Sequence, residues 1–213
     1  MIAIGFDTET AGLFGDMISL GASVDGVNVF EETIQASHPG SIGAIAVHGI
    51  TQAQLDAAEP LGYVLGRFDD WLPAGVDFYW VAHNAPYDVK IIEQTLLSLG
   101  DDLSLWKHTV HAFKRPVVDT LRAAQKLLTA EEVAYVDGYK LDNLWLFHAT
   151  ETLGQTMDEA VKWMQKNRAQ HVAWRDAEMC RDLWVQTLKP RVPAEIGSLD
   201  RLVEWLDEPM LIE

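Results

Sequence analysis

The N-terminal part of the chain alternates between short apolar runs and turn-forming residues. Ile2–Phe6 is a short apolar run, the pattern of a central strand that is buried on both faces. Met17–Val24 and Val27–Thr33 are two further strand-like runs, and Asp25-Gly26 separates them. Because Asp-Gly readily adopts the positive φ angles of a tight hairpin turn, the pattern predicts an antiparallel meander of three strands.

After the meander, the apolar positions recur mostly at helical spacing. Thr51 is a good N-cap for a helix over Gln52–Ala58, and Asn84 stands in the same place before a helix over Pro86–Leu99. Phe78–Ala82 is the fourth predicted strand. The remaining expected elements are the short strand Val117-Val118 and the helices Leu61–Leu72, Thr120–Leu128, Leu141–Phe147, Asp158–Asn167, Val172–Leu188 and Leu199–Leu206.

This order of elements predicts an α/β fold in which a mixed five-stranded sheet lies between layers of helices. The length of 213 residues suits one domain with a short appendage. Pro190, Pro193 and Gly197 interrupt the last long helix. We therefore expect one domain over residues 1–190 and a short helical extension over residues 191–213, docked on the domain or trailing from it.

The overall composition is that of an ordinary globular protein, with 48% hydrophobic and 23% charged residues. No apolar run reaches the length that spans a bilayer, and the N-terminus turns acidic too early for a signal peptide. The single cysteine, Cys180, cannot form an internal disulfide. Together these features favour a cytoplasmic protein.

The charge balance is strongly acidic: 16 Lys and Arg stand against 32 Asp and Glu, a formal net charge of −16. Long-range attraction to a polyanion is therefore not expected to drive binding. An acidic protein can still bind a few nucleotides at a local site when bound cations reverse the sign of the charge there. The charge argues against tight binding along duplex DNA and leaves local capture of an end open.

The first candidate chemistry is a pair of acids that follows the first predicted strand. Asp7 and Glu9 are two residues apart, so both side chains project from the same face of the strand. Two carboxylates this close repel, and a divalent cation such as Mg²⁺ removes the conflict. On its own, an Asp-x-Glu pair is more often two solvent-facing acids at a strand end.

Two further acids lie beside apolar stripes of predicted helices. Asp88 is in the first turn of Pro86–Leu99, and Asp176 lies within Val172–Leu188. A carboxylate in apolar surroundings is costly unless it is paired or bound to a metal. The alternatives are compensation of the helix dipole by Asp88 and a buried salt bridge for Asp176.

His171 stands five residues before Asp176, and five residues turn a helix by about 500°. The two side chains would not share a helix face, so we expect His171 on the loop that precedes the helix. An unperturbed imidazole titrates at about pH 6.5, a useful range for a general base. As an isolated residue, His171 would more often be a surface or capping histidine.

These five residues, in this order, resemble the DEDDh (DnaQ-like) 3′→5′ exonuclease family. The stretches that carry the resemblance are Phe6-Asp7-Thr8-Glu9-Thr10 with Gly12-Leu13, Val47-His48-Gly49-Ile50-Thr51, Val81-Ala82-His83-Asn84-Ala85-Pro86-Tyr87-Asp88, Val118-Asp119-Thr120-Leu121, Lys140-Leu141-Asp142-Asn143-Leu144 and His171-Val172-Ala173-Trp174-Arg175-Asp176-Ala177. The third of these has Tyr where the family usually has Phe. As an ordered set these motifs are specific to the family, although each motif alone would be weak evidence for it. The chain length and the C-terminal tail are similar to those of short members of the exodeoxyribonuclease X type.

The resemblance implies a ribonuclease H-like fold and hydrolysis of a terminal phosphodiester with two divalent cations, Mg²⁺ or Mn²⁺. By analogy, Asp7 would bind both cations, and Glu9 and Asp176 would complete the site that carries the attacking water. Asp88 would hold the second cation near the leaving 3′ oxygen, and His171 would accept the proton of the nucleophile as general base. Four carboxylates against two dications leave such a site near neutral, which reconciles an acidic chain with a nucleic acid substrate.

Four residues are candidates for substrate contact: Thr10, Leu13, His48 and Asn84. By the resemblance, Leu13 and His48 would contact the terminal nucleotide, with Leu13 stacking on its base or wedging behind it. Without the resemblance, core packing of Leu13 and a polar contact of His48 near a helix are the simpler interpretations. Asn84 also suits a helix cap, and Asp119 is either the first acid of the next helix or an acid that supports the site.

The sequence leaves three functions open. The favoured one is a 3′→5′ exonuclease that removes nucleoside 5′-monophosphates from single-stranded or frayed DNA 3′ ends, in repair or proofreading. The second is a 3′→5′ exoribonuclease or oligonucleotide-trimming enzyme of the same family, which differs in its contacts to the 2′-OH. The third, an inactive interaction module, is disfavoured because it has no need for a costly acidic cluster. The oligomeric state stays open, a dimer included.

Overall fold

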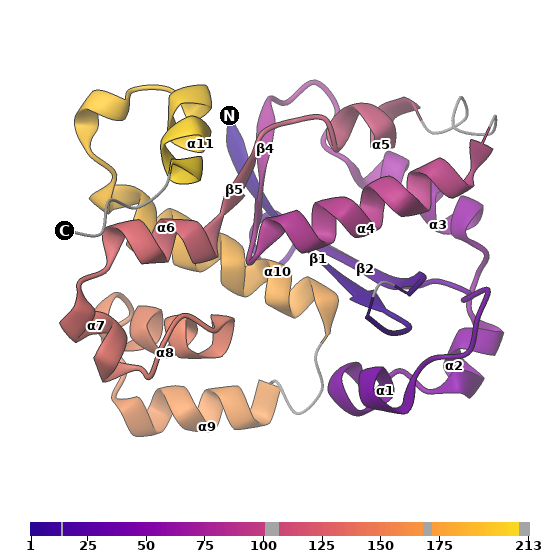
Figure 1. Ribbon diagram of the computed structural model, residues 1–213, viewed down its shortest axis with the longest axis horizontal. Helices are drawn as coiled ribbons and strands as arrows, with labels where there is room; N and C mark the ends of the chain where they lie inside the picture. Colours follow the sequence, from indigo (N-terminus) through magenta and orange to yellow (C-terminus); the bar gives the residue numbers. More distant parts are fainter. Residues whose placement is uncertain (14, 101–106, 168–171, 209–213) are drawn as a thin grey trace.

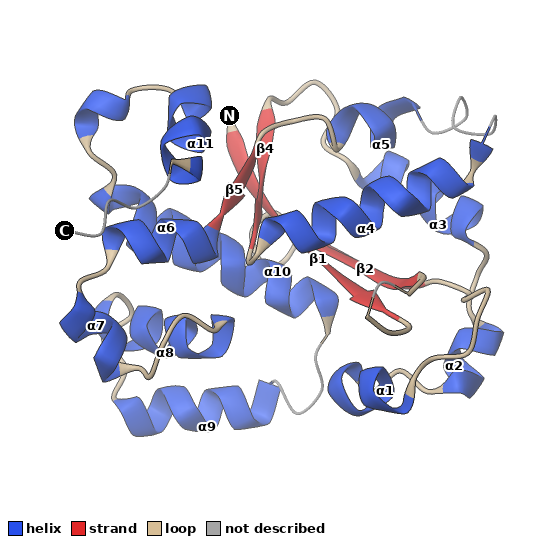
Figure 2. Cartoon of the chain, in the orientation of Figure 1, coloured by secondary structure: helices blue, strands red, loops and turns tan. Residues whose placement is uncertain are grey.

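The computed structural model describes residues 1–13, 15–100, 107–167 and 172–208. Their strands form one five-stranded sheet in the order β3-β2-β1-β4-β5. Figure 2 shows strands in red and helices in blue. The strands are β1 (Ile2–Thr10), β2 (Met17–Ser23), β3 (Val29–Thr33), β4 (Phe78–Ala82) and β5 (Val117–Asp119).

The sheet is mixed, as predicted. β1 pairs with β2, and β2 with β3, in antiparallel fashion, so the meander is confirmed. The tight turn predicted at Asp25-Gly26 is wrong, because residues 24–28 connect the two strands and only Gly26 of the pair has a positive φ, 75°. β4 pairs with β1, and β5 with β4, in parallel fashion. The parallel half brings the carboxyl ends of β1, β4 and β5 to the same edge of the sheet.

The helices follow the predicted order with three additions. The described helices are α1 (Ile42–His48), α2 (Gln52–Ala57), α3 (Leu61–Trp71), α4 (Ala85–Ser98), α5 (Lys107–Ala112), α6 (Thr120–Leu127), α7 (Ala130–Tyr135), α8 (Leu141–Glu151), α9 (Met157–Asn167), α10 (Ala173–Asp182) and α11 (Leu199–Asp207). The pattern did not predict α1, α5 and α7, because helices of six or seven residues contain too few turns for apolar periodicity; α2 is as short and was predicted through its N-cap Thr51. Side-chain caps mark two of them, Ser41 before α1 and Thr129 before α7.

The prediction of one continuous α-helix over Val172–Leu188 is wrong. α10 covers its first half, and a π-helical segment, η2 (Leu183–Leu188), covers the second. Two short 3₁₀ turns follow, η3 (Lys189–Arg191) and η4 (Ala194–Ile196). The apolar spacing shows which residues face the core, but it does not distinguish a π-turn from an α-turn.

Two apolar clusters lie on opposite faces of the sheet, which confirms the three-layer arrangement. Figure 1 shows how the helices are placed around the sheet. Trp80 of β4 belongs to the first cluster with residues of α3, α4 and α5. Its chain neighbours Tyr79 and Val81 belong to the second, with residues of α6, α8, α10, η2 and α11. This alternation follows from the two-residue period of a strand.

The C-terminal helix α11 packs on α6. Leu202 and Leu206 are buried in the second cluster, and the Lys126 Nζ lies 4.9 Å from the centre of the Trp205 ring. Arg122 of α6 pairs with Asp207 at the end of α11. Among the described helices, none has the length and hydrophobicity that crossing a membrane requires.

Candidate active site

Three of the predicted acids converge near one end of β1. One carboxylate oxygen each of Asp7, Glu9 and Asp176 lies within 4.8 Å of the other two. Asp7 and Glu9 project from one face of β1, and Asp176 reaches them from the first turn of α10. Asp176 is only 5% exposed, whereas Asp7 and Glu9 keep part of their surface in solvent. We call these three residues the carboxylate group.

Two glycines allow α10 to lie close enough to the sheet for this convergence. A Cβ atom on Gly5 of β1 would lie 1.9 Å from the carbonyl oxygen of Ala177. A Cβ atom on Gly21 of β2 would lie 2.0 Å from the backbone nitrogen of Trp174. Gly21 is the register partner of Asp7. The helix backbone therefore rests directly on the two strands, beside the acids they carry. The sequence pattern did not single out either glycine, because a glycine in a strand does not reveal which segment will approach it.

Glu31 of β3 holds the N-terminus of α10. The sequence pattern did not indicate this role either. Its Oε2 accepts a hydrogen bond from the Trp174 backbone N–H at 2.7 Å, and its Oε1 accepts one from the Ser19 hydroxyl at 2.9 Å. Burial raises the pKa of Glu31, the hydrogen bond from Trp174 opposes this, and the nearby Asp176 raises it further. Val172, the N-cap residue of α10, provides no side-chain cap, so Glu31 performs that task from a distant strand.

Asp88 lies outside the carboxylate group. Its Oδ1 accepts hydrogen bonds from the Thr8 backbone N–H at 3.0 Å and from the Thr8 hydroxyl at 2.6 Å. Thr8 alternates with Asp7 and Glu9 along β1, so its side chain faces the other side of the sheet. Burial raises the pKa of Asp88 to about 7, with the Thr8 hydrogen bonds acting in the opposite direction. The predicted cation contact of Asp88 stays a prediction.

The predicted general base, His171, lies outside the described residues. The description resumes at Val172, which directly precedes α10. The role of His171 therefore stays a prediction that rests on the family resemblance.

The predicted substrate contacts differ in their accessibility. Leu13 is 82% exposed, so the alternative interpretation of core packing is wrong. His48 is only 3% exposed, and its Nδ1 accepts a hydrogen bond from the Ile50 backbone N–H at 3.0 Å. Thr10 is buried, with its hydroxyl 3.0 Å from that of Tyr87. Contact of these residues with a substrate stays a prediction.

Asn84 occupies the N-cap position of α4, as expected, but its side chain forms no capping hydrogen bond. The backbone of Asn84 is left-handed, with φ 59°, and its N–H donates to the Asp119 Oδ1 at 3.0 Å. Asp119 in turn caps α6 by accepting from the Leu121 N–H. Asp119 thus takes the role of a helix N-cap that the sequence suggested.

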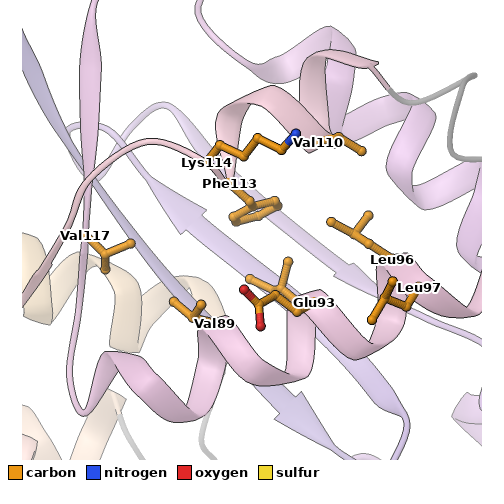
Figure 3. A pocket seen from close by; sticks show the side chains of 9 residues that line it. Val89, Glu93, Leu96, Leu97, Val110, Phe113, Lys114 and Val117 are labelled. Atoms are coloured by element: carbon orange, nitrogen blue, oxygen red, sulfur yellow. The ribbon is translucent and has the colours of Figure 1, made fainter.

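A separate apolar hollow lies between α4 and α5, and Figure 3 shows its lining. The cavity measures about 350 Å³. The side chains around it are Val89, Ile92, Glu93, Leu96, Leu97, Val110, Phe113, Lys114 and Val117. None of the predicted catalytic acids lines it, so it is not the reaction site.

The carboxylate group suits a hard divalent cation. Carboxylate oxygens are the ligands that Mg²⁺ and Mn²⁺ favour. With Mg²⁺–oxygen distances of about 2.1 Å, two ligands on opposite sides of the ion lie about 4.2 Å apart. At most one of the three oxygen pairs can lie on opposite sides, and neighbouring ligands lie about 3.0 Å apart, so the oxygens, now within 4.8 Å of one another, would draw closer around the ion. Asp7, Glu9 and Asp176 therefore fit such a cation.

Comparisons with known proteins show which family the chain is similar to. A family model described as "Exonuclease" matches residues 4–183. A DNA polymerase III subunit epsilon-like protein of Rhodobacter capsulatus is 34% identical over 167 residues, which cover 74% of this chain and 20% of that protein. A PolC-type DNA polymerase III of Streptococcus pyogenes serotype M1 is 34% identical over 129 residues, which cover 57% of this chain and 8% of that protein. The chain thus spans a fifth or less of the length of these relatives.

Two solved structures share the fold. Exonuclease X in complex with 5′ overhanging duplex DNA has a TM-score of 0.57 at 18% identity, covering 96% of this chain and 99% of that one. The nuclease domain of 3′hExo, a DEDDh family member bound to rAMP, has a TM-score of 0.52 at 15% identity, covering 80% of this chain and 94% of that one. At these identities the likeness concerns the fold alone.

Proposed function

The chain belongs to the exonuclease family, and we propose that it is a metal-dependent 3′→5′ exonuclease of the DEDDh (DnaQ-like) type that acts on DNA. In this proposal it removes nucleoside 5′-monophosphates from single-stranded or frayed 3′ ends. We further propose that residues 1–190 are the exonuclease domain and that residues 191–213 are a short C-terminal extension, of which the described helix α11 packs on α6.

The observation that carries the proposal is the carboxylate group. Asp7, Glu9 and Asp176 come from segments almost 170 residues apart in the chain, and their oxygens meet within 4.8 Å. Bringing three acids together costs free energy unless positive charge compensates them. An inert scaffold would have no reason to hold a helix on two glycines to reach this arrangement.

Each acid has a distinct part in the proposed reaction. Asp7 and Glu9 of β1 and Asp176 of α10 would hold one divalent cation, and Asp88 with Asp7 would hold a second. Mg²⁺ or Mn²⁺ bound there would supply acidification of a water molecule and compensation of the charge on the phosphate. His171, on the segment before α10, would take the proton of the attacking water as general base.

The acidic surface favours local capture of a chain end over binding along a duplex. With a formal net charge of −16, the protein has little long-range attraction for DNA, so affinity must come from the site itself. DNA is the favoured substrate because the first relative is named as a DNA polymerase subunit-like protein and one neighbouring structure contains DNA. RNA is the second candidate, since the other neighbour contains rAMP. A role in repair or proofreading is consistent with the DNA substrate.

The test is a cleavage assay on 5′-labelled single-stranded DNA, duplex DNA and RNA with Mg²⁺, Mn²⁺ or EDTA. We expect stepwise shortening from the 3′ end that disappears with EDTA and in Asp7→Ala. Asp70→Ala, which changes an exposed acid on α3, is the matched control and should keep wild-type activity. Wild-type protein that shortens none of the three substrates would overturn the proposal and favour an inactive interaction module.

A further inference from the structure

Asp119 is a buried acid that joins the beginnings of two helices. It is the last residue of β5 and is 7% exposed. Its Oδ1 accepts hydrogen bonds from the Leu121 N–H at 2.9 Å and from the Asn84 N–H at 3.0 Å. Its carboxylate also accepts from the backbone N–H of Ala85. One carboxylate thus binds the first backbone N–H groups of both α6 and α4.

The turn that Asp119 holds has an uncommon backbone. Asn84 has φ 59°, a left-handed conformation that costs free energy for residues other than glycine and persists only when its surroundings fix it. The Asn84 side chain forms no capping hydrogen bond, so the amides at the start of α4 depend on Asp119. The neighbouring Thr120 hydroxyl lies 3.0 Å from the His83 Nδ1 and donates to the Ala82 carbonyl at 3.2 Å. The start of α6 therefore holds the whole turn between β4 and α4.

This turn directly precedes Asp88. Asp88 lies in the first turn of α4, three residues after Ala85, and its carboxylate is fixed at the other end by Thr8. A shift of Asn84 and Ala85 would move or rotate the first turn of α4, and Asp88 with it. The position of Asp88 is thus set by two contacts, Thr8 on β1 and the turn that Asp119 holds.

We propose that Asp119 is a positioning residue for Asp88 and thereby sets the affinity of the cation that Asp88 holds. It acts through backbone hydrogen bonds to Asn84 and Ala85 and does not itself bind the cation or the substrate. The inference rests on the proposed function in one respect, the contact of Asp88 with a cation. Groups that orient ligands in this way typically change metal affinity or activity about 10- to 100-fold when they are replaced.

The simplest alternative is that Asp119 only caps α6. Asp119→Ser distinguishes the two roles, because serine is as good an N-cap as aspartate but its shorter side chain does not reach Asn84. Asp119→Ala removes both roles. Asp25→Asn is the control: Asp25 also accepts two backbone N–H groups, from Val27 at 3.1 Å and Asn28 at 2.7 Å, in the exposed β2–β3 turn.

The experiment measures Mn²⁺ binding by calorimetry in the presence of thymidine 5′-monophosphate, together with thermal unfolding and the Mn²⁺ dependence of DNA shortening. For Asp119→Ser we expect an almost unchanged unfolding temperature, an unchanged first Mn²⁺ and a second Mn²⁺ bound about 10- to 100-fold more weakly. Activity should recover as Mn²⁺ is raised. Asp25→Asn should bind both cations like the wild type.

Two results would overturn the inference. One is an Asp119→Ser protein with both Mn²⁺ affinities at wild-type values; the other is an equal weakening of both cations, the result of a general loss of structure. If Asp119→Ala fails to fold, Asp119→Ser still tests the inference, because it retains the cap of α6. Wild-type protein that binds no Mn²⁺ and shortens no DNA would instead overturn the proposed function, so the two failures are distinguishable.

Discussion

Replacing Gly5 by alanine tests whether the carboxylate group depends on the close approach of α10 to the sheet. The added Cβ would lie 1.9 Å from the Ala177 carbonyl oxygen, and ordinary contact requires at least 3.4 Å. Either α10 or β1 must therefore move by about 1.5 Å at this point. Ala177 adjoins Asp176, so the displacement acts directly on one of the three converging acids.

The size of this displacement decides its effect. Mg²⁺ binds oxygens at about 2.0–2.1 Å and tolerates little deviation, so a shift of more than an ångström removes Asp176 from the shared site. A misplacement of about 1 Å can lower a rate about 100-fold, and overpacking typically destabilises by about 1–3 kcal/mol. We expect Gly5→Ala to remain folded, with a lowered unfolding temperature, weaker Mn²⁺ binding and activity reduced about 100-fold or more.

The assay combines shortening of 5′-labelled single-stranded DNA with Mn²⁺ titration and thermal unfolding. Gly43→Ala is the matched control, because a Cβ there meets no atom within 4 Å and Gly43 lies in the helix α1. It should keep wild-type activity and gain about 1 kcal/mol of stability from helix propensity. A Gly5→Ala protein with wild-type activity and Mn²⁺ affinity would refute the reasoning.

Three further predictions follow from the same structure. His171→Ala should slow DNA shortening about 100-fold or more while leaving Mn²⁺ binding nearly unchanged, because a general base contributes to the chemical step; equal loss of both would reject that role. Glu31→Ala should weaken Mn²⁺ binding and lower the unfolding temperature, since the Trp174 N–H loses its acceptor, and Glu31→Gln, which keeps an acceptor oxygen, should restore most of both. His148 is fully buried, and burial lowers its pKa from 6.5 to about 4. Its neutral form therefore contributes stability above about pH 6.5 that is lost as the pH falls toward 4, up to about 3 kcal/mol, and urea unfolding of His148→Gln should show a flatter dependence in this range.

The strands, most helices and the identity of the acids follow from the residue pattern alone. Strand and helix periods are local properties, so the meander around Asp25-Gly26, the central strand β1 and the burial of Asp176 were all predictable from neighbouring residues. The ordered motifs also indicated the family, which the match over residues 4–183 confirms. The residue pattern did not predict the helices that are too short to show a period, such as α5, or the π-helical winding of Leu183–Leu188.

The assembly of the site depends on the packing of distant segments. Asp176 meets Asp7 and Glu9 because Gly5 and Gly21 leave room for a helix backbone, and no local pattern shows which segment will fill that room. Glu31 reaches a helix 143 residues away, and Asp119 holds a turn 35 residues before it. Asp88 proved to contact β1 through Thr8, on the face opposite to the carboxylate group. Such contacts depend on the approach of distant segments, which packing determines, whereas the residue pattern determines only which face of each segment is buried.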